Sequence, residues 1–410
     1  MLNPSESEER SPPNDLHAFI IQVGVLLQRF GTPSHRLEAV LVHLGKTLGV
    51  KSAFLYTPTA LIASFTDDCG EATYVRRVES GPVDVDKLIR FDETLEGVEA
   101  GNLSVADARE AMERIAESPS PFPAWAYTLA CGACCASVCV FFRGGVSEVV
   151  AAFILGIVVA GLEWLLSYRL FDRGLLEPLA GFVAAVGALA VSQFCVAIDD
   201  RIVTLASLIV LVPGLTLTVA LTELAVGHLS AGVARIAGAG VSLMTMSIGA
   251  ALGWRLAGAW REIPEESFWP LPEWSIWPAI AVAPLCFAIV FRARWRQWPV
   301  IYIVTILGFS ASYFVGAKWG IESGAFAGAL VVALGSNCYA RLRNRPALVP
   351  LTPGILVLVP GSLGYRSMTA FIQNETLAGV DAASAMLIVA AALVGGILTA
   401  NIFLPPKRIL

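Results

Sequence analysis

The chain has 410 residues, of which 56% are hydrophobic and only 15% are charged, so it is too apolar to be a single water-soluble globule. The formal net charge of −5 describes neither end: residues 1–121 carry 19 acidic and 11 basic side chains, and the remainder carries 14 acidic and 17 basic ones. No basic pattern with interleaved aromatic residues occurs, so nucleic acid is excluded as an expected partner.

The first 120 residues predict a tail and a small cytosolic domain. Residues 1–14 are polar and rich in Pro and Ser, without the apolar core of a signal peptide, and predict a disordered cytosolic tail. Residues 15–120 predict an α+β domain, with Ser34 and Asp84 as helix caps and Ser104 to Asp107 as a capping box. Its expected elements are helices over 16–30 and 34–49, strands over 52–56, 60–65 and 72–78, and helices over 84–100 and 104–117.

A proline-rich linker, residues 118–123, separates this domain from the apolar remainder. The remainder predicts ten transmembrane helices, because each apolar run is long enough, or nearly so, to cross the hydrocarbon core. We place them at 122–142, 146–168, 176–197, 202–226, 230–254, 276–291, 298–317, 322–340, 347–371 and 381–403. The sixth of these spans is the shortest.

An internal repeat divides the apolar part into two halves. Val-Leu-Val-Pro-Gly at Val210–Gly214 returns 147 residues later at Val357–Gly361, and the same offset relates Gly181 to Gly328 and Gly249 to Gly396. Five spans, an odd number, separate the copies, so the two halves must face opposite ways across the membrane. The expected fold is therefore a membrane all-α protein with a 5+5 inverted repeat over residues 121–260 and 261–410, preceded by the α+β domain.

The distribution of Lys and Arg among the short loops predicts the orientation. With the N-terminus inside, ten basic residues fall on the cytosolic side and five on the outer side, the positive-inside bias. Both termini are then cytosolic. The inner residues are Arg169, Arg173, Arg292, Arg294, Arg296, Arg341, Arg343, Arg345, Lys407 and Arg408, and the outer ones are Arg143, Arg201, Arg255, Arg261 and Lys318.

Each copy of the Pro-Gly pair is expected to break its transmembrane helix near the bilayer centre, because proline removes a helix hydrogen bond and glycine loosens the backbone. Such paired breaks in two repeats point to a transporter's binding site, although kinks that serve packing alone are the alternative. Arg366 is either a clamp for a carboxylate or a side chain that reaches the outer interface. The candidate substrate-binding residues are Pro213, Gly214, Thr216, Thr218, Pro360, Gly361, Ser362, Tyr365 and Arg366.

Carboxylates within the spans are candidates for proton coupling, because an ionisable side chain inside a membrane is energetically expensive. Glu163 is the stronger candidate, and Glu223 lies closer to the cytosolic end. The cysteines of the first span are interpreted as small buried hydrophobic residues. Three glycines at spacing four, Gly320, Gly324 and Gly328, predict a close helix contact within the fold or between subunits. No metal or cofactor is expected.

Sequence motifs across nearly the whole chain resemble those of the threonine/serine exporter family. Gly31-Thr-Pro-Ser-His-Arg-Leu-Glu38 and Phe54-Leu-Tyr-Thr-Pro58 are similar to its N-terminal domain. Ala293-Arg-Trp-Arg-Gln-Trp-Pro299 and Leu358-Val-Pro-Gly-Ser-Leu-Gly-Tyr365 are similar to its C-terminal half, closest to the single-chain members that include the pheromone-regulated membrane proteins. The resemblance implies a ten-span exporter of threonine and serine driven by protons. The positions of this chain that match the family's motifs are His35, Arg36, Glu38, Pro213, Gly214, Pro360 and Gly361.

The expected function is therefore a secondary transporter, not an enzyme, in the cell membrane, with the bilayer and small amino acids as partners and a homo-oligomer left open. A dicarboxylate exporter of the same fold is one alternative, and it requires a second basic group such as Arg235 beside Arg366. A cytosolic hydrolase coupled to export is the other. Ser34 and His35 point apart on a helix and form no nucleophile–base pair, and no Walker motif is present.

Overall fold

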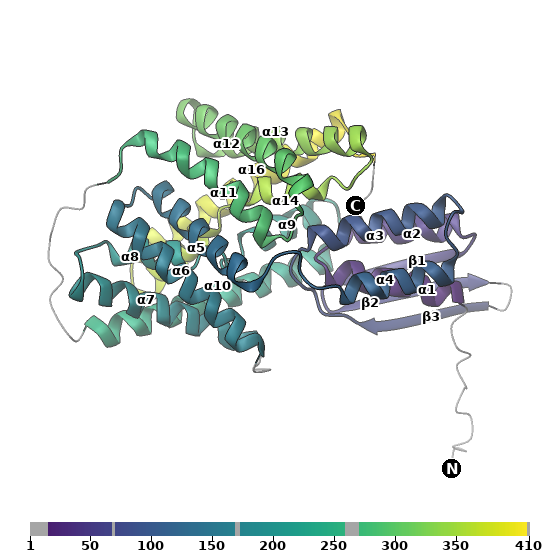
Figure 1. Cartoon of the computed structure of the whole chain (residues 1–410), viewed down its shortest axis with the longest axis horizontal. Coiled ribbons are helices and arrows are strands. Elements are labelled where there is room, and N and C mark those ends of the chain that lie inside the picture. The colour runs from purple at the N-terminus through teal and green to yellow at the C-terminus, as the bar shows by residue number, and fades with distance from the viewer. Residues whose placement is uncertain (1–14, 68–69, 169–172, 259–269, 408–410) are drawn as a thin grey trace, which may run out of the picture. The chain divides into compact units, whose positions relative to one another are not determined.

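The computed structural model describes residues 15–67, 70–168, 173–258 and 270–407 (Figure 1). The predicted tail 1–14 lies outside the described residues. The chain divides into two compact units, one around residues 15–83 and 90–118 and the other formed by residues 84–89 and 119–407.

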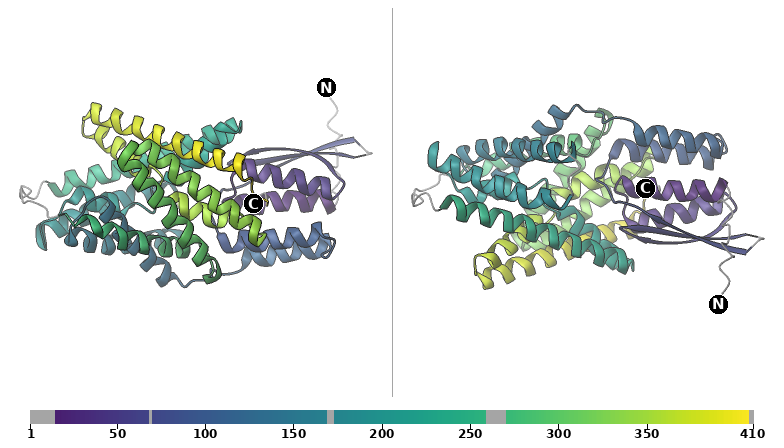
Figure 2. Two further views of the ribbon diagram at one scale, coloured as in Figure 1. Left: turned by 90° about the horizontal axis from the view of Figure 1, so that it is seen from above. Right: turned by 90° about the horizontal axis from the view of Figure 1, so that it is seen from below.

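The first unit is a three-stranded antiparallel sheet with helices against it. The strand order is β1-β2-β3, with Phe54 opposite Ala63 and Ile62 opposite Val75. In Figure 2, α1 and α2 lie between the sheet and the two helices that follow the sheet in sequence, α3 and α4. The elements are α1 (Asp15–Arg29), α2 (Ser34–Thr47), β1 (Lys51–Thr57), β2 (Ala60–Asp67), β3 (Gly70–Arg77), α3 (Val85–Glu99) and α4 (Val105–Glu117). The predicted order of helices and strands is confirmed.

Two of the three expected helix caps are present. The Ser104 hydroxyl accepts the backbone N–H of Asp107 at 3.1 Å, and the Asp84 carboxylate accepts that of Lys87 at the same distance. The expectation for Ser34 is wrong: Pro33 is the N-cap and Ser34 is the first helical residue, fully buried. Proline has no N–H to lose and its φ of −62° suits a helix entry, so the helix begins without a side-chain cap.

The described residues of the second unit form helices joined by turns. Among the described residues, nine helices are long and apolar enough to cross a membrane, counting α14 and α15 together as one span. The remaining expected span, 202–226, consists of two shorter helices, α8 and α9. The helices are α5 (Ala124–Phe141), α6 (Val146–Tyr168), α7 (Leu176–Phe194), α8 (Asp200–Ser207), α9 (Gly214–Ala225), α10 (Leu229–Gly258), α11 (Ile276–Val290), α12 (Trp298–Trp319), α13 (Ile321–Arg343), α14 (Leu348–Leu356), α15 (Gly361–Ile372) and α16 (Thr376–Phe403), with short 3-10 turns η1 (Arg173–Leu175), η2 (Glu273–Ser275) and η3 (Trp295–Gln297).

Close helix contacts in this unit repeat at the 147-residue offset. A Cβ added at Gly249 in α10 would meet the carbonyl of Pro178 in α7, and one at Gly396 in α16 would meet that of Phe326 in α13. A second equivalent pair of contacts lies beside the breaks. A Cβ added at Gly232 would meet the side chain of Leu224, and one added at Gly379 would meet that of Phe371. In lipid, small residues permit this approach of helix backbones. The sequence repeat is therefore also a repeat of contacts.

The expected glycine face is only partly present. Gly324 and Gly328 lie in α13 against α12, where added Cβ atoms would come within 2.6 Å of the Ser312 carbonyl oxygen and 2.8 Å of the Ser312 Cβ. Gly320 is not on that helix face, because it is the N-cap with φ of +94° and turns the chain from α12 into α13. The interface is thus an intramolecular helix contact.

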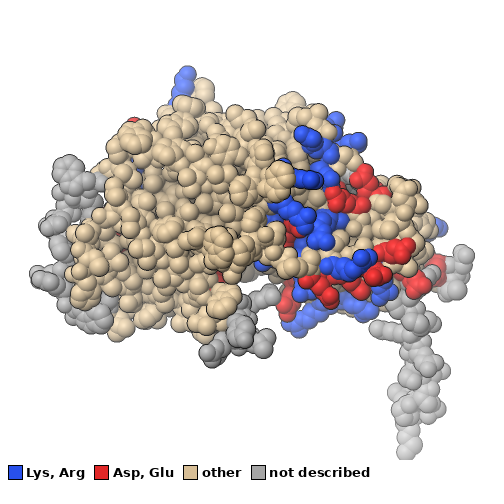
Figure 3. All heavy atoms as spheres, in the orientation of Figure 1, with Lys and Arg blue, Asp and Glu red and all other residues tan. Residues whose placement is uncertain are grey.

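The surface of the second unit suits a lipid surround. Val150, Ile154 and Val158 lie four residues apart on α6 and are each exposed by 44–52%. Figure 3 shows large uncharged areas over the membrane helices, with Lys, Arg, Asp and Glu gathered elsewhere. Cys131, Cys134, Cys135 and Cys139 are buried, as predicted for small hydrophobic residues, and free.

Candidate functional site

Both Pro-Gly copies interrupt their helices, as predicted. Helix α8 ends at Ser207 and α9 begins at Gly214, and α14 ends at Leu356 and α15 begins at Gly361. Pro213 and Pro360 are the N-caps of the second half-helices, with similar conformations: φ of −77° and −83°, ψ of 44° and 29°. The two copies therefore share a local backbone geometry as well as a sequence.

The two breaks meet at their glycines. A Cβ added at Gly361 would lie 3.0 Å from the Cα of Gly214, and one added at Gly214 would lie 3.2 Å from the Cα of Gly361. The flanking contacts are reciprocal too, because Gly214 faces Val359 and Gly361 faces Val212, each at 2.7 Å from the added atom. Only glycine allows two backbones this close.

The N-termini of the half-helices α9 and α15 meet at the breaks. The first backbone N–H groups of α9 and α15 have no partners inside their helices. At the ends of α8 and α14, the carbonyls of Ala206 and Ile355 accept hydrogen bonds from the following turn, from the N–H groups of Ile209 and Leu358. Helix N-termini carry partial positive charge and C-termini partial negative charge. The two meeting N-termini therefore offer partners for a carboxylate group.

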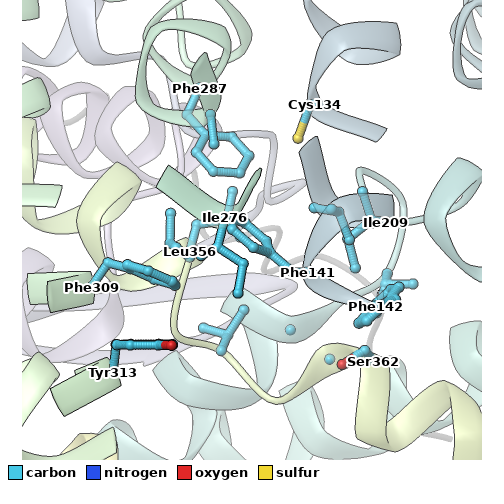
Figure 4. A pocket seen from close by; sticks show the side chains of 17 residues that line it. Cys134, Phe141, Phe142, Ile209, Ile276, Phe287, Phe309, Tyr313, Leu356 and Ser362 are labelled. Atoms are coloured by element: carbon cyan, nitrogen blue, oxygen red, sulfur yellow. The ribbon is translucent and has the colours of Figure 1, made fainter. Parts of the chain in front are cut away.

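A cavity of about 320 Å³ adjoins this point. Gly214, Gly361 and Ser362 belong to its wall. Figure 4 shows the rings of Phe141, Phe287, Phe309 and Tyr313 around the space, with the hydroxyl groups of Tyr313 and Ser362 directed into it. The other lining residues are Cys134, Val138, Phe142, Ile209, Val212, Ile276, Ala283, Leu356, Val357 and Val359. Among the residues that the structure describes, no charged side chain lines the cavity.

Six of the nine predicted binding residues do not line the cavity: two are the N-caps Pro213 and Pro360, and the other four are Thr216, Thr218, Tyr365 and Arg366. Thr216 is not among the lining residues, and the hydroxyl of Thr218 donates to the carbonyl of Gly214 at 3.3 Å. Tyr365 is 2% exposed within a hydrophobic cluster of the first half. Arg366 is exposed and holds its guanidinium 5.3 Å from the centre of the Phe142 ring, so it is next to the wall but not part of it.

The two candidate carboxylates have different partners. Glu163 in α6 accepts a hydrogen bond from the Tyr127 hydroxyl at 3.1 Å. Along α5, Tyr127 is followed by Cys134, Val138 and Phe141 at successive steps of seven, four and three residues, so all four lie on one face of the helix. The last three of them line the cavity. The Glu163 site therefore lies along the same helix face as the cavity.

Glu223, the second candidate, is engaged in an ion pair. It is fully buried, and the Arg235 Nε of α10 lies 3.2 Å and 3.0 Å from its two carboxylate oxygens. Arg235 is 16% exposed. The basic group that a dicarboxylate would need is thus already held by a carboxylate of the protein.

The motif residues His35, Arg36 and Glu38 all lie on α2 in the first unit. Gly31 makes the preceding turn with φ of +83°, and a side chain there would meet the backbone of Val83. Arg36 is 8% exposed, and burial lowers its pKa to about 10, so it keeps its charge at neutral pH. Arg36 is therefore part of the domain's packing, whereas His35 and Glu38 are half-buried.

The aromatic part of the cavity wall leaves no signal in the sequence. Phe287, Phe309 and Tyr313 come from α11 and α12, outside the repeated motif. An aromatic residue in an apolar span is equally compatible with a core, lipid or cavity position, so periodicity carries no signal for it. The Glu223–Arg235 pair was missed as a pair because a turn separates its two residues.

The chain matches two family profiles. Residues 18–257 match one described as a threonine/serine exporter, and residues 278–403 match a second threonine/serine exporter profile. Together the two profiles cover the α+β domain and both membrane halves. No solved structure matches the chain.

Fungal proteins are among the curated relatives. Pheromone-regulated membrane protein 10 of Eremothecium gossypii is 28% identical over 86% of this chain, and that of Zygosaccharomyces rouxii is 26% identical over 89%. A Schizosaccharomyces pombe protein, uncharacterized protein C7D4.12c, is 26% identical over 85%. The chain spans 49%, 39% and 48% of these relatives, about half of their length or less.

Proposed function

Because the chain belongs to the threonine/serine exporter family, we propose that it exports small neutral amino acids, threonine and serine first, in exchange for protons. The meeting of the two broken helices beside a cavity supports this proposal most directly. A zwitterion would place its carboxylate at the half-helix N-termini of α9 and α15 and its ammonium at backbone carbonyls within the two breaks. Gly214, Gly361 and Ser362 are the residues we assign to this contact.

The uncharged wall favours an amino acid over a dicarboxylate. A second carboxylate would enter a cavity whose described lining has no basic side chain, and desolvating it there would be expensive. Arg235 is paired with Glu223. Arg366, above the Phe142 ring, is one guanidinium beside the wall and is assigned to steer a single carboxylate.

Alternating access follows from an inverted repeat in this proposal. The equivalent contacts of Gly232 and Gly379, and the reciprocal contacts of Gly214 and Gly361, are those expected when two similar halves are related by a two-fold axis. Exchange of conformation between the halves would open the cavity first to one side and then to the other. The first unit is assigned a regulatory role, because its motif residues His35, Arg36 and Glu38 lie outside the membrane spans and Arg36 is buried in the unit's own packing.

Efflux from proteoliposomes tests the function. Vesicles containing the full chain and labelled threonine, serine or succinate are followed with and without a pH gradient. We expect threonine and serine efflux that the gradient accelerates, and no succinate efflux above protein-free vesicles. Succinate efflux without threonine efflux would reverse the substrate assignment.

Replacing Glu163 with glutamine is expected to uncouple transport from protons. Glutamine can still accept the Tyr127 hydrogen bond but has no titratable proton. For a pH difference of about one unit, coupling to one proton supports a roughly tenfold threonine concentration ratio, which the variant should lose while retaining threonine exchange. The exposed Glu375→Gln is the control. Gradient-driven accumulation that survives in Glu163→Gln would remove this residue from the coupling.

Thiol labelling tests the orientation. In a variant without native cysteines, single cysteines at Ser147 and Glu375, both exposed, should react from outside with an impermeant reagent. Cysteines at the exposed Arg294 and Arg343 should react only after the membrane is opened. Arg173 is a further inner position. The distribution of charges also predicts that Glu265 is on the outer side, but this residue lies outside the described residues. Labelling of Ser147 and Glu375 from opposite sides would contradict the inverted repeat.

A further inference from the structure

The cavity beside the breaks has two chemically different walls. One is the backbone at Gly214 and Gly361, where the proposed zwitterion contact lies. The other is formed by aromatic rings of α5, α11 and α12, among them Phe287 and Phe309. Phe309 stacks on Phe141 at 5.4 Å and on Tyr313 at 6.1 Å between ring centres, so the rings form a continuous apolar surface.

The second wall is larger than a hydroxylated side chain requires. The cavity of about 320 Å³ is roughly twice the ~150 Å³ of an apolar protein cavity that binds benzene. If the substrate were serine, most of the aromatic surface would face water or empty space. An apolar side chain would cover this surface and release the water from it, which is favourable in proportion to the apolar area.

The polar side chains that line the cavity are few and neutral. In Figure 4 the hydroxyls of Tyr313 and Ser362 point into the cavity, and the thiol of Cys134 is at its edge. These groups can accommodate the hydroxyl of threonine. They offer no ionic partner for an acidic or basic side chain, which is costly to bury unpaired.

We propose that the aromatic wall is the side-chain subsite and that it selects neutral amino acids with apolar side chains, of the size of leucine, as well as threonine. This inference rests on the proposed function and adds to it the substrate class. Phe309 is its central specificity-determining residue, because it touches both neighbouring rings of the wall. Leucine is therefore exported at least as well as threonine, and lysine and glutamate are not exported.

The test compares labelled leucine, threonine, lysine and glutamate in proteoliposomes that contain the full chain. Phe309→Ser makes the wall polar and smaller, and it should lower the leucine-to-threonine efflux ratio by roughly tenfold. Phe309→Leu keeps the wall apolar and should keep leucine export. Phe314→Ser is the matched control, because Phe314 is on the same helix, is 62% exposed and does not line the cavity. Its ratio should equal that of the unmodified chain.

Each outcome decides the inference. Threonine export without leucine export, or an unchanged ratio in folded Phe309→Ser, overturns the side-chain subsite and leaves the proposed function standing. Export of lysine or glutamate at the leucine rate also overturns it. If no amino acid is exported at all, the proposed function falls together with the inference. If Phe309→Ser does not fold, the Phe309→Leu variant and the substrate series on the unmodified chain still give the answer.

Discussion

Replacing Gly361 with leucine is expected to lower threonine efflux by about 100-fold, the size of effect that follows when reacting or binding groups are displaced by roughly 1 Å. A Cβ at this position would lie 2.7 Å from Val212 Cγ1 and 3.0 Å from the Gly214 Cα, so one of the two breaks must move. The rest of the leucine side chain would add bulk beside the cavity that Gly361 lines. Gly214→Leu should have the same effect, because the contact is reciprocal. The measurement is initial efflux per reconstituted protein.

A matched control separates this effect from the addition of a large side chain to a membrane helix. Gly238 in α10 is exposed, and a Cβ there would meet nothing within 4 Å, so Gly238→Leu should transport normally. Overpacking at the break costs about 1–3 kcal/mol, which leaves most of the protein folded. Normal efflux in both Gly214→Leu and Gly361→Leu would contradict the placement of the site at the breaks.

Removing one partner of the Glu223–Arg235 pair is expected to destabilise the membrane unit by about 3–5 kcal/mol. Glu223 is fully buried, so Arg235→Met leaves a carboxylate without its guanidinium partner in surroundings that penalise charge. Glu223→Gln leaves Arg235 in the same state. The double variant Glu223→Gln/Arg235→Met has no formal charge at the site and should recover most of the loss. Unfolding in detergent, followed by denaturant titration, measures these differences.

The exposed pair Arg143–Glu273 provides the comparison. Its atoms are 3.5 Å apart, but its side chains are 74% and 78% exposed, so Arg143→Met should change stability by about 0–1 kcal/mol. The contrast between the two pairs isolates burial as the cause. Equal stability of the double variant and the Arg235→Met single variant would show that the charges are not coupled.

Much of the local structure of this protein could be predicted from its sequence. The helices and strands of residues 15–117 follow from short-range periodicity and capping chemistry, and the α4 cap at Ser104 is an example. The breaks at Pro213 and Pro360 follow from the missing N–H of proline, which acts on its own helix whatever surrounds it. The 147-residue offset also indicated which glycines would occupy equivalent contacts, as Gly249 and Gly396 do.

The composition of the candidate site depended on the tertiary structure. Thr218 and Ser362 both follow a Pro-Gly pair, yet the first bonds to its own helix and the second lines the cavity. Phe309 reaches the site from α12, far from either break in sequence, because helix packing brings its ring there. The sequence by itself therefore determined where the backbone breaks, since that is a property of Pro and Gly. Only the fold decided which side chains surround the breaks, since every apolar span carries the same hydrophobic signal whether it faces lipid, core or cavity.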